Sequence, residues 1–209
     1  MVRTVVSWAI PNLTIGSFLA RLLAAVVVAM VHSFVAAILA RRLGDAGPMR
    51  DGRARLAAWG HLDPFGTLHA MLFLVAWSAP LRLDAAALRG GARVGVVVGA
   101  GAALIGLASL ALGARSLASL IGRDAGANAL DMILVAVADV ALATAVAQLV
   151  PLPPFLGGAF WRFARRASGR PKALAYGVGA AVLFALSLAG VTGMVMQPWR
   201  TAAFRWLGF

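Results

Sequence analysis

The chain has 209 residues, of which 62% are hydrophobic, and its formal net charge is +12. A soluble domain is about 45–50% apolar, so this composition excludes an ordinary soluble fold and predicts an all-α polytopic membrane protein. The chain contains no cysteine and no glutamate, which excludes disulfides, thiolate metal ligands and a glutamate general base.

The positive charge does not indicate a nucleic-acid partner. The 18 arginines and the single lysine lie mainly at the ends of apolar segments. Membrane proteins place cations there, where they set topology and meet anionic headgroups. We therefore expect a multi-pass membrane protein that contacts anionic lipids.

In chain order, the sequence predicts an interfacial segment at 1–16 and a first membrane span at about 17–40. A polar loop and a short apolar segment at 64–83 follow. Three further apolar runs predict spans at about 93–114, 129–151 and 173–196. We divide the chain into this first segment, a membrane core at 17–160, and a part at 161–209 that holds a basic loop, the last span and an aromatic-basic tail.

The apolar segment 64–83 lies between Pro64 and Pro80 and is short for a span. If it crosses the bilayer, the cations divide ten to nine between the two sides. If it dips in and returns, they divide thirteen to six, which fits the positive-inside rule far better. The sequence therefore favours four spans with a re-entrant segment, and five spans are the alternative.

Small residues recur every fourth position through the last span. This stripe consists of Gly177, Ala181, Ala185, Ala189 and Gly193. Such stripes let helix backbones approach closely in lipid. An Ala/Gly-rich composition is the alternative explanation.

Four short motifs occur in order along the core. They read VHSFVAA at 31–37 with LGD at 43–45, HLDPFGT at 61–67, WSAPLRL at 77–83, and QLVPLPPFLG at 148–157. Together they resemble the motifs of the site-2 protease family of intramembrane zinc metalloproteases, over residues 17–160. The resemblance implies a core built like that of the family, in which two histidines one helical turn apart and a distant aspartate hold zinc.

The departures from the family pattern concern the residues of the reaction. His32 matches the first zinc ligand, but Ser33 stands at the glutamate position, Ala36 at the second histidine and Leu156 at the aspartate. One imidazole cannot hold zinc, and no carboxylate base remains to deprotonate a water molecule. The resemblance therefore implies an inactive homologue, a pseudoprotease without a cofactor.

Several polar residues leave alternatives open. His32, His61 and His69 are weak candidates for a replacement metal site, against the reading that they are structural. Asp139 and Gln148 are predicted to be buried polar residues. Asp139 is either a proton or ion site, an interhelical lock with His32 or Arg21, or a protonated aspartate bonded within the bundle.

The predicted contacts with lipid or partner are the basic loop and one tail aromatic: Arg162, Arg165, Arg166, Arg170, Lys172 and Trp199. We expect a non-catalytic integral membrane subunit that packs against other membrane proteins in a hetero-oligomeric bacterial complex, respiratory or photosynthetic. The alternatives are a regulatory pseudoprotease that binds a transmembrane helix without cleaving it, and a small proton or ion pathway that uses Asp139.

Overall fold

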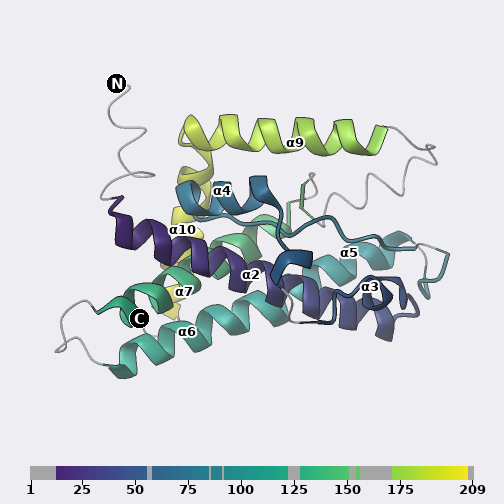
Figure 1. The fold of residues 1–209 in the computed structure, drawn as a ribbon, viewed down its shortest axis with the longest axis horizontal. Helices are drawn as coiled ribbons and strands as arrows, with labels where there is room; N and C mark the ends of the chain where they lie inside the picture. Colours follow the sequence, from purple (N-terminus) through teal and green to yellow (C-terminus); the bar gives the residue numbers. More distant parts are fainter. Residues whose placement is uncertain are drawn as a thin grey trace.

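The computed structural model describes residues 13–55, 58–84, 86–90, 92–121, 128–150, 154–155 and 171–206. Within these ranges the chain is mostly helical and has no β-strand (Figure 1). Three of the described helices are long and apolar enough to cross a membrane, and a bent pair brings the number to four if it counts as one span. The expectation of an all-α membrane protein with several spans agrees with this architecture.

Helix α2 (Ile15–Arg42) is the longest, and its 28 residues extend over about 42 Å. Thr14 begins it with a capping box, because its hydroxyl accepts from the Ser17 amide while the Ser17 hydroxyl accepts from the Thr14 amide. Arg41 and Arg42 occupy its last turn, where cations meet the negative end of the helix dipole. Its buried face consists mainly of alanine, so neighbouring helices can approach it closely.

The segment 64–83 folds back as a hairpin. Asp63 caps helix α4 (Pro64–Phe73), and Pro64 occupies the first helical position, where its missing amide costs nothing. The ten residues of α4 extend over about 15 Å, roughly half of a hydrocarbon core. Leu74 then takes the left-handed conformation (φ 65°), and the chain returns in extended form until Ser78 pairs with Leu62.

Hydrogen bonds join the chain before this hairpin to the chain after it. The amide of Arg89 donates to the carbonyl of Leu43 over 2.8 Å, and the amide of Asp84 donates to Oδ2 of Asp45 over 2.8 Å. The loop that follows α2, with the short helices α3 (Gly47–Arg50) and η1 (Ala58–Gly60), therefore lies on the same side as the segment that precedes α5. This arrangement agrees with the re-entrant reading that the charge count favours.

The next span has three parts: α5 (Ala92–Gly101), the π-helical segment η2 (Ala102–Ala108) and α6 (Ser109–Ile121). Its glycines permit close packing on α2. A Cβ on Gly106 would lie 3.1 Å from Cγ2 of Val35, and one on Gly101 would lie 3.1 Å from Cδ1 of Leu39.

Helix α7 (Ala129–Gln148) packs between α2 and α6, and Asn128 caps it by accepting from the amide of Asp131. The main core lies where α2, α4, η2, α6 and α7 meet, and it consists largely of alanine, valine and leucine. The end of α7 leads toward Pro154 and Phe155, which brings the fourth motif beside the hairpin.

The last expected span, 173–196, is not a single helix. Helix α9 (Pro171–Leu188) and helix α10 (Val191–Trp206) meet at an angle of 79°, measured between Tyr176–Leu188 and Val191–Trp199. Gly190 takes a positive φ of 80° at the break, a conformation that glycine adopts at little cost. The small-residue stripe is interrupted there, so only Gly177, Ala181 and Ala185 share one helix.

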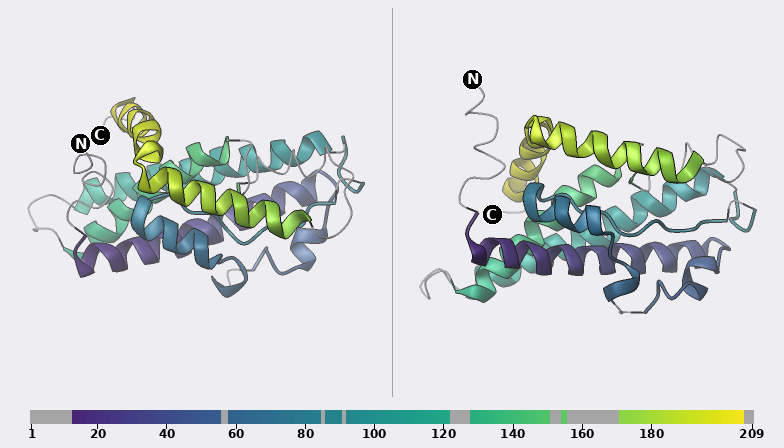
Figure 2. Two further views of the ribbon diagram at one scale, coloured as in Figure 1. Left: turned by 90° about the horizontal axis from the view of Figure 1, so that it is seen from above. Right: turned by 45° about the horizontal axis from the view of Figure 1, so that its top comes forward.

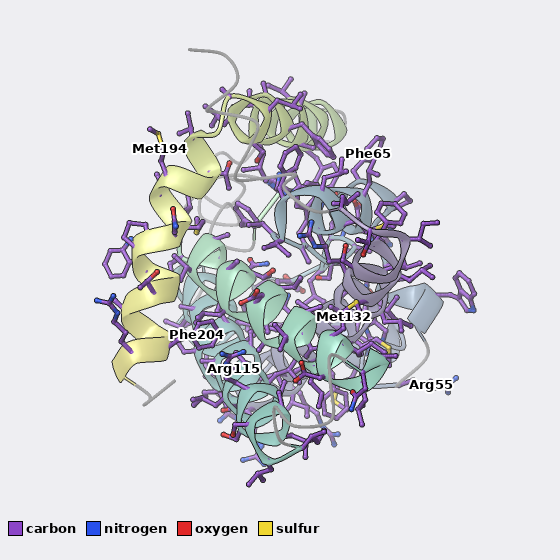
Figure 3. The ribbon with its side chains drawn as sticks, turned by 90° about the vertical axis from the view of Figure 1, so that its left-hand side faces the viewer. Arg55, Phe65, Arg115, Met132, Met194 and Phe204 are labelled. Carbon is purple, nitrogen blue, oxygen red and sulfur yellow. The ribbon has the colours of Figure 1, made fainter. Side chains whose placement is uncertain are left out.

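Helix α9 lies beside α4 on one side of the bundle, and α10 turns down across the end of the bundle (Figure 2). Phe204 of α10 packs on the main core, and the guanidinium carbon of Arg115 lies 5.5 Å from the centre of its ring (Figure 3). Met194, on the preceding turns of α10, points away from the bundle and is 74% exposed. Helix α10 is thus attached to the bundle at both ends, through Thr192 and Met196 in its first half and through Phe204 in its second.

Candidate functional site

His32 lies in the middle of α2 and is fully buried against the extended segment that follows α4 in the hairpin. Its Nδ1 atom lies 3.4 Å from the hydroxyl of Ser78. Its Nε2 atom and the hydroxyl of the neighbouring Ser33 are buried without a hydrogen-bond partner among the described residues. A buried polar atom without a partner is uncommon in a folded protein, and it makes this position a candidate site.

A small cavity of about 10 Å³ adjoins His32. Its lining comes from α2, the hairpin and the end of α7: His32, Trp77, Ser78, Pro80, Gln148 and Pro154. The structure thus brings together residues of three of the four motifs. The volume suits about one water molecule and leaves no room for a peptide.

Ala36 follows His32 by one helical turn and is completely buried. It packs in a small apolar cluster with Leu81 of the hairpin and with Val98 and Ala102 of the next span. The position at which the family pattern has its second histidine is therefore occupied by core packing.

The residues around His32 do not fit a zinc ion. A catalytic zinc takes three protein ligands from histidine, cysteine or carboxylate side chains. Here the other polar groups around the cavity are the neutral side chains of Ser78 and Gln148, with Ser33 beside His32. Leu156 lies outside the described residues, and a leucine side chain carries no donor atom at all. We derive no reaction step through zinc.

Backbone carbonyls engage two of the three histidines considered for a replacement metal site. His61 Nε2 donates to the carbonyl of Arg55 over 2.6 Å, and His69 Nδ1 donates to the carbonyl of Val75 over 2.7 Å. Among the residues that the structure describes, His32, His61 and His69 are not gathered into one group of metal-binding side chains.

A hydrogen-bonded cluster around Asp63 holds the hairpin and α9 together. The carboxylate of Asp63 accepts from the amide of Gly66 (2.8 Å), from Nε1 of Trp77 (3.0 Å) and from the hydroxyl of Tyr176 (2.5 Å). Trp77 Nε1 also lies 2.7 Å from the Tyr176 hydroxyl oxygen, so the three side chains form a closed triangle. Sequence reasoning missed Tyr176, which is the only tyrosine in the chain.

Gly66 explains a second part of the HLDPFGT motif. A Cβ at this position would lie 2.9 Å from two ring atoms of Trp77 and closer still to its carbonyl oxygen. Only glycine lets α4 approach the extended segment around Trp77 so closely. The motif therefore determines the shape of the hairpin. Asp63 and Pro64 begin α4, and Gly66 lets the segment around Trp77 pack against this helix.

His69 connects α4 to the bend between α9 and α10. Its Nε2 atom lies 2.8 Å from the hydroxyl of Ser187, which lies 2.7 Å from the hydroxyl of Thr192. The His69 ring also packs against Phe73, Trp77 and Phe184, with centroid distances of 4.9–5.1 Å. Sequence reasoning had no signal for Ser187 or Thr192, which lie more than a hundred residues after His69.

The other predicted polar residues are placed as follows. Gln148 is buried at the cavity, and Asp139, also predicted to be a buried polar residue, is partly buried. Arg21 donates from Nη1 to the carbonyl of Met71 over 3.1 Å. Arg53 donates to the carbonyl of Pro80 over 3.3 Å, and burial lowers the pKa of its guanidinium.

The predicted contact residues are described only in part. Arg162, Arg165, Arg166 and Arg170 lie outside the described residues, and Lys172 is described only as a position in the first turn of α9. Trp199 lies on α10 and is 63% exposed. Its exposure is compatible with contact to lipid or to a partner.

Comparison of the chain with protein-family models, curated proteins and solved structures finds no match.

Proposed function

We propose that this protein is a non-catalytic integral membrane subunit, a pseudoprotease scaffold that packs against other membrane proteins. The proposal includes descent from the site-2 protease family and a place in a hetero-oligomeric complex of a bacterial inner membrane, respiratory or photosynthetic. The observation that carries it is the outward-facing row of small residues on α9.

The row consists of Gly177, Ala181 and Ala185, all exposed. Elsewhere in the described part of the chain, small residues on helices mostly face the core of the bundle. A Cβ on Gly177 would meet no atom within 4 Å, so the backbone is accessible there. In lipid, small residues favour close approach of a second helix, because they allow backbones to make extensive van der Waals contact.

A shallow groove continues this surface toward α4. It has a volume of about 360 Å³ and is lined by Phe65, Leu68, Tyr176, Gly177, Ala181 and Phe184. Phe65 and Leu68 are 60% and 45% exposed. Large apolar side chains beside a small-residue row give a ridge and a groove, the shape that a partner helix fits.

The surroundings of His32 support the non-catalytic part of the proposal. One imidazole faces neutral side chains, Ala36 is packed in an apolar cluster, and the adjoining cavity suits only about one water molecule. These surroundings do not favour peptide hydrolysis. The outer faces of the helices remain available for contacts with other proteins in the membrane.

The test is gentle extraction of the native protein followed by mass spectrometry of the chains that remain attached. We expect partner chains in a fixed ratio to this one. Ala181→Leu should release them, since leucine keeps the helix apolar but blocks close approach. Ala129→Leu, at the exposed start of α7, is the matched control and should retain them. Extraction of this chain with no partner chain attached would contradict the proposal. Extraction with transmembrane helices of different proteins, in no fixed ratio, would favour the regulatory pseudoprotease instead.

A further inference from the structure

Helix α10 runs in a different direction from the long helices of the bundle. In Figure 1, α2, α6 and α9 follow the long axis of the molecule, whereas α10 runs across it after the bend of 79°. The 18 residues of α9 extend over about 27 Å, close to the thickness of about 30 Å of a hydrocarbon core. By its length α9 is nearly a complete crossing, so α10 begins close to the membrane surface.

The exposed side chains of α10 form an apolar face and a polar face. The apolar face has members four positions apart, 39–63% exposed, and consists of Val191, Val195 and Trp199. The polar face has the same spacing, is also exposed, and consists of Gln197, Thr201 and Arg205. Gln197 follows Val195 by two positions, about 200° round the helix, so the two faces point in different directions.

The bend turns the apolar face toward the bilayer. Val191 and Val195 line the groove in the bend together with Val182 of α9, so the apolar face lies on the inner side of the bend. Helix α9 extends through the membrane on that side. Thr192 and Met196 of α10 line the same groove, so the polar face points to the outer side of the bend, away from α9.

Arg115 of α6 indicates the level at which α10 lies. Its guanidinium carbon is 5.5 Å from the centre of the Phe204 ring, so the second half of α10 lies beside it (Figure 3). Arg115 precedes the end of α6 at Ile121 by six residues, about 9 Å along the helix. Arginines near the ends of spans extend their charge to the interface, because a charge in the hydrocarbon core is costly. The second half of α10 therefore lies at the level of the interface.

We propose that α10 lies along the membrane surface, on the side where α6 ends, and that its partner is the headgroup layer of the bilayer. The apolar face with Trp199 enters the edge of the hydrocarbon, and the polar face with Arg205 contacts water and lipid phosphates. Amphipathic helices with aromatic residues on one face and cations on the other bind bilayers in this orientation, with the apolar face about 5–10 Å deep. This lipid contact is separate from the row of small residues on α9 that is proposed for protein contact.

The test places single spin labels on α10 in the full-length protein, reconstituted alone into bilayer discs of phosphatidylglycerol and phosphatidylcholine. The chain has no cysteine, so Val195→Cys and Trp199→Cys on the apolar face, and Gln197→Cys and Thr201→Cys on the polar face, each carry one label. Collision with oxygen reports hydrocarbon, and collision with a water-soluble nickel chelate reports water. Leu104→Cys, exposed in the middle of a span, is the control for hydrocarbon.

We expect oxygen collision at Val195 and Trp199 to exceed that at Gln197 and Thr201 several-fold, with the reverse order for the nickel chelate. Val195 and Trp199 should also lie at equal depth, although they are about 6 Å apart along the helix. A depth that changes steadily from Val195 to Thr201 would mean that α10 crosses the bilayer, and would overturn the proposal. Protection of the apolar face from both reagents, as in a protein contact, would overturn it too, and so would equal collision of both faces with nickel.

The design separates this proposal from misfolding and from the protein contact at α9. Each labelled variant is compared with the unlabelled protein by melting temperature, and each face has two positions, so one destabilised variant does not decide the result. The partner chains proposed to bind at Ala181 are absent from the discs. Failure of the surface orientation would therefore leave the outcome of the extraction experiment unchanged.

Discussion

The hydroxyl of Tyr176 donates a 2.5 Å hydrogen bond to Asp63, and so joins α9 to the residue that caps α4. Asp63 keeps two other donors, from Gly66 and Trp77, but both belong to its own hairpin. Tyr176 is therefore the contact through which this cluster reaches the last part of the chain.

Tyr176→Phe should destabilise the protein by about 1–3 kcal/mol, because it removes one donor from a buried carboxylate and leaves the ring in place. The measurement is the free energy of unfolding in detergent micelles. A double-mutant cycle with Asp63→Ala should give a coupling of about 0.5–3 kcal/mol. Strictly additive effects of the two changes would show that the contact does not form.

Gly66→Ala should disrupt the hairpin, since a Cβ there meets the Trp77 ring and backbone. We expect a loss of several degrees in melting temperature. Gly113→Ala is the matched control: a Cβ at Gly113 meets nothing within 4 Å, and alanine favours an exposed helical position by about 0.5–1 kcal/mol. Similar melting temperatures for the two variants would contradict the close approach.

His69→Leu should separate α4 from the bend between α9 and α10. The change leaves the carbonyl of Val75 without its histidine donor, at a cost of about 1–3 kcal/mol, and leaves the Ser187 hydroxyl bonded only to Thr192. Protease digestion should then cut earlier near Gly190. Ser187→Ala removes one contact only and should have a smaller effect on the same two measurements.

Chelation should leave the protein unchanged. One imidazole among neutral side chains gives zinc too few ligands, so 1,10-phenanthroline should not alter the melting temperature, and purified protein should contain no stoichiometric zinc. A control soluble zinc protease under the same conditions should lose its metal. Stoichiometric zinc with a chelator-dependent melting temperature would overturn the reading of the His32 site.

Part of this fold could be predicted because it depends on local signals. Long apolar runs mark the spans, and an Asp-Pro pair marks the start of α4, since both residues act on the first turn of a helix. The unequal charge count favoured the fold-back of 64–83. Each of these signals lies within the segment that it describes, or in the loops beside it.

The remainder depends on partners that are distant in the sequence. The break at Gly190 lies in an apolar run that looks continuous in the sequence. The neighbouring residues do not distinguish Gly190, where the helix ends, from Gly177, which lies inside a helix. His69 looked like a metal ligand because its partner Ser187 is 118 residues away. The fully packed environment of Ala36 likewise depends on Val98 and Ala102, which the VHSFVAA motif at 31–37 cannot reveal.

Two hydrogen bonds, from the Arg89 amide to the Leu43 carbonyl and from the Asp84 amide to the Asp45 carboxylate, have a consequence for labelling from outside. The chain has no cysteine, so a single thiol can be introduced at exposed Arg50 or at exposed Arg89 without removing any other. An impermeant maleimide added to sealed vesicles should modify both positions or neither. Modification of only one of them would mean that the chain crosses the membrane between Arg50 and Arg89, which this fold instead places in the same aqueous compartment.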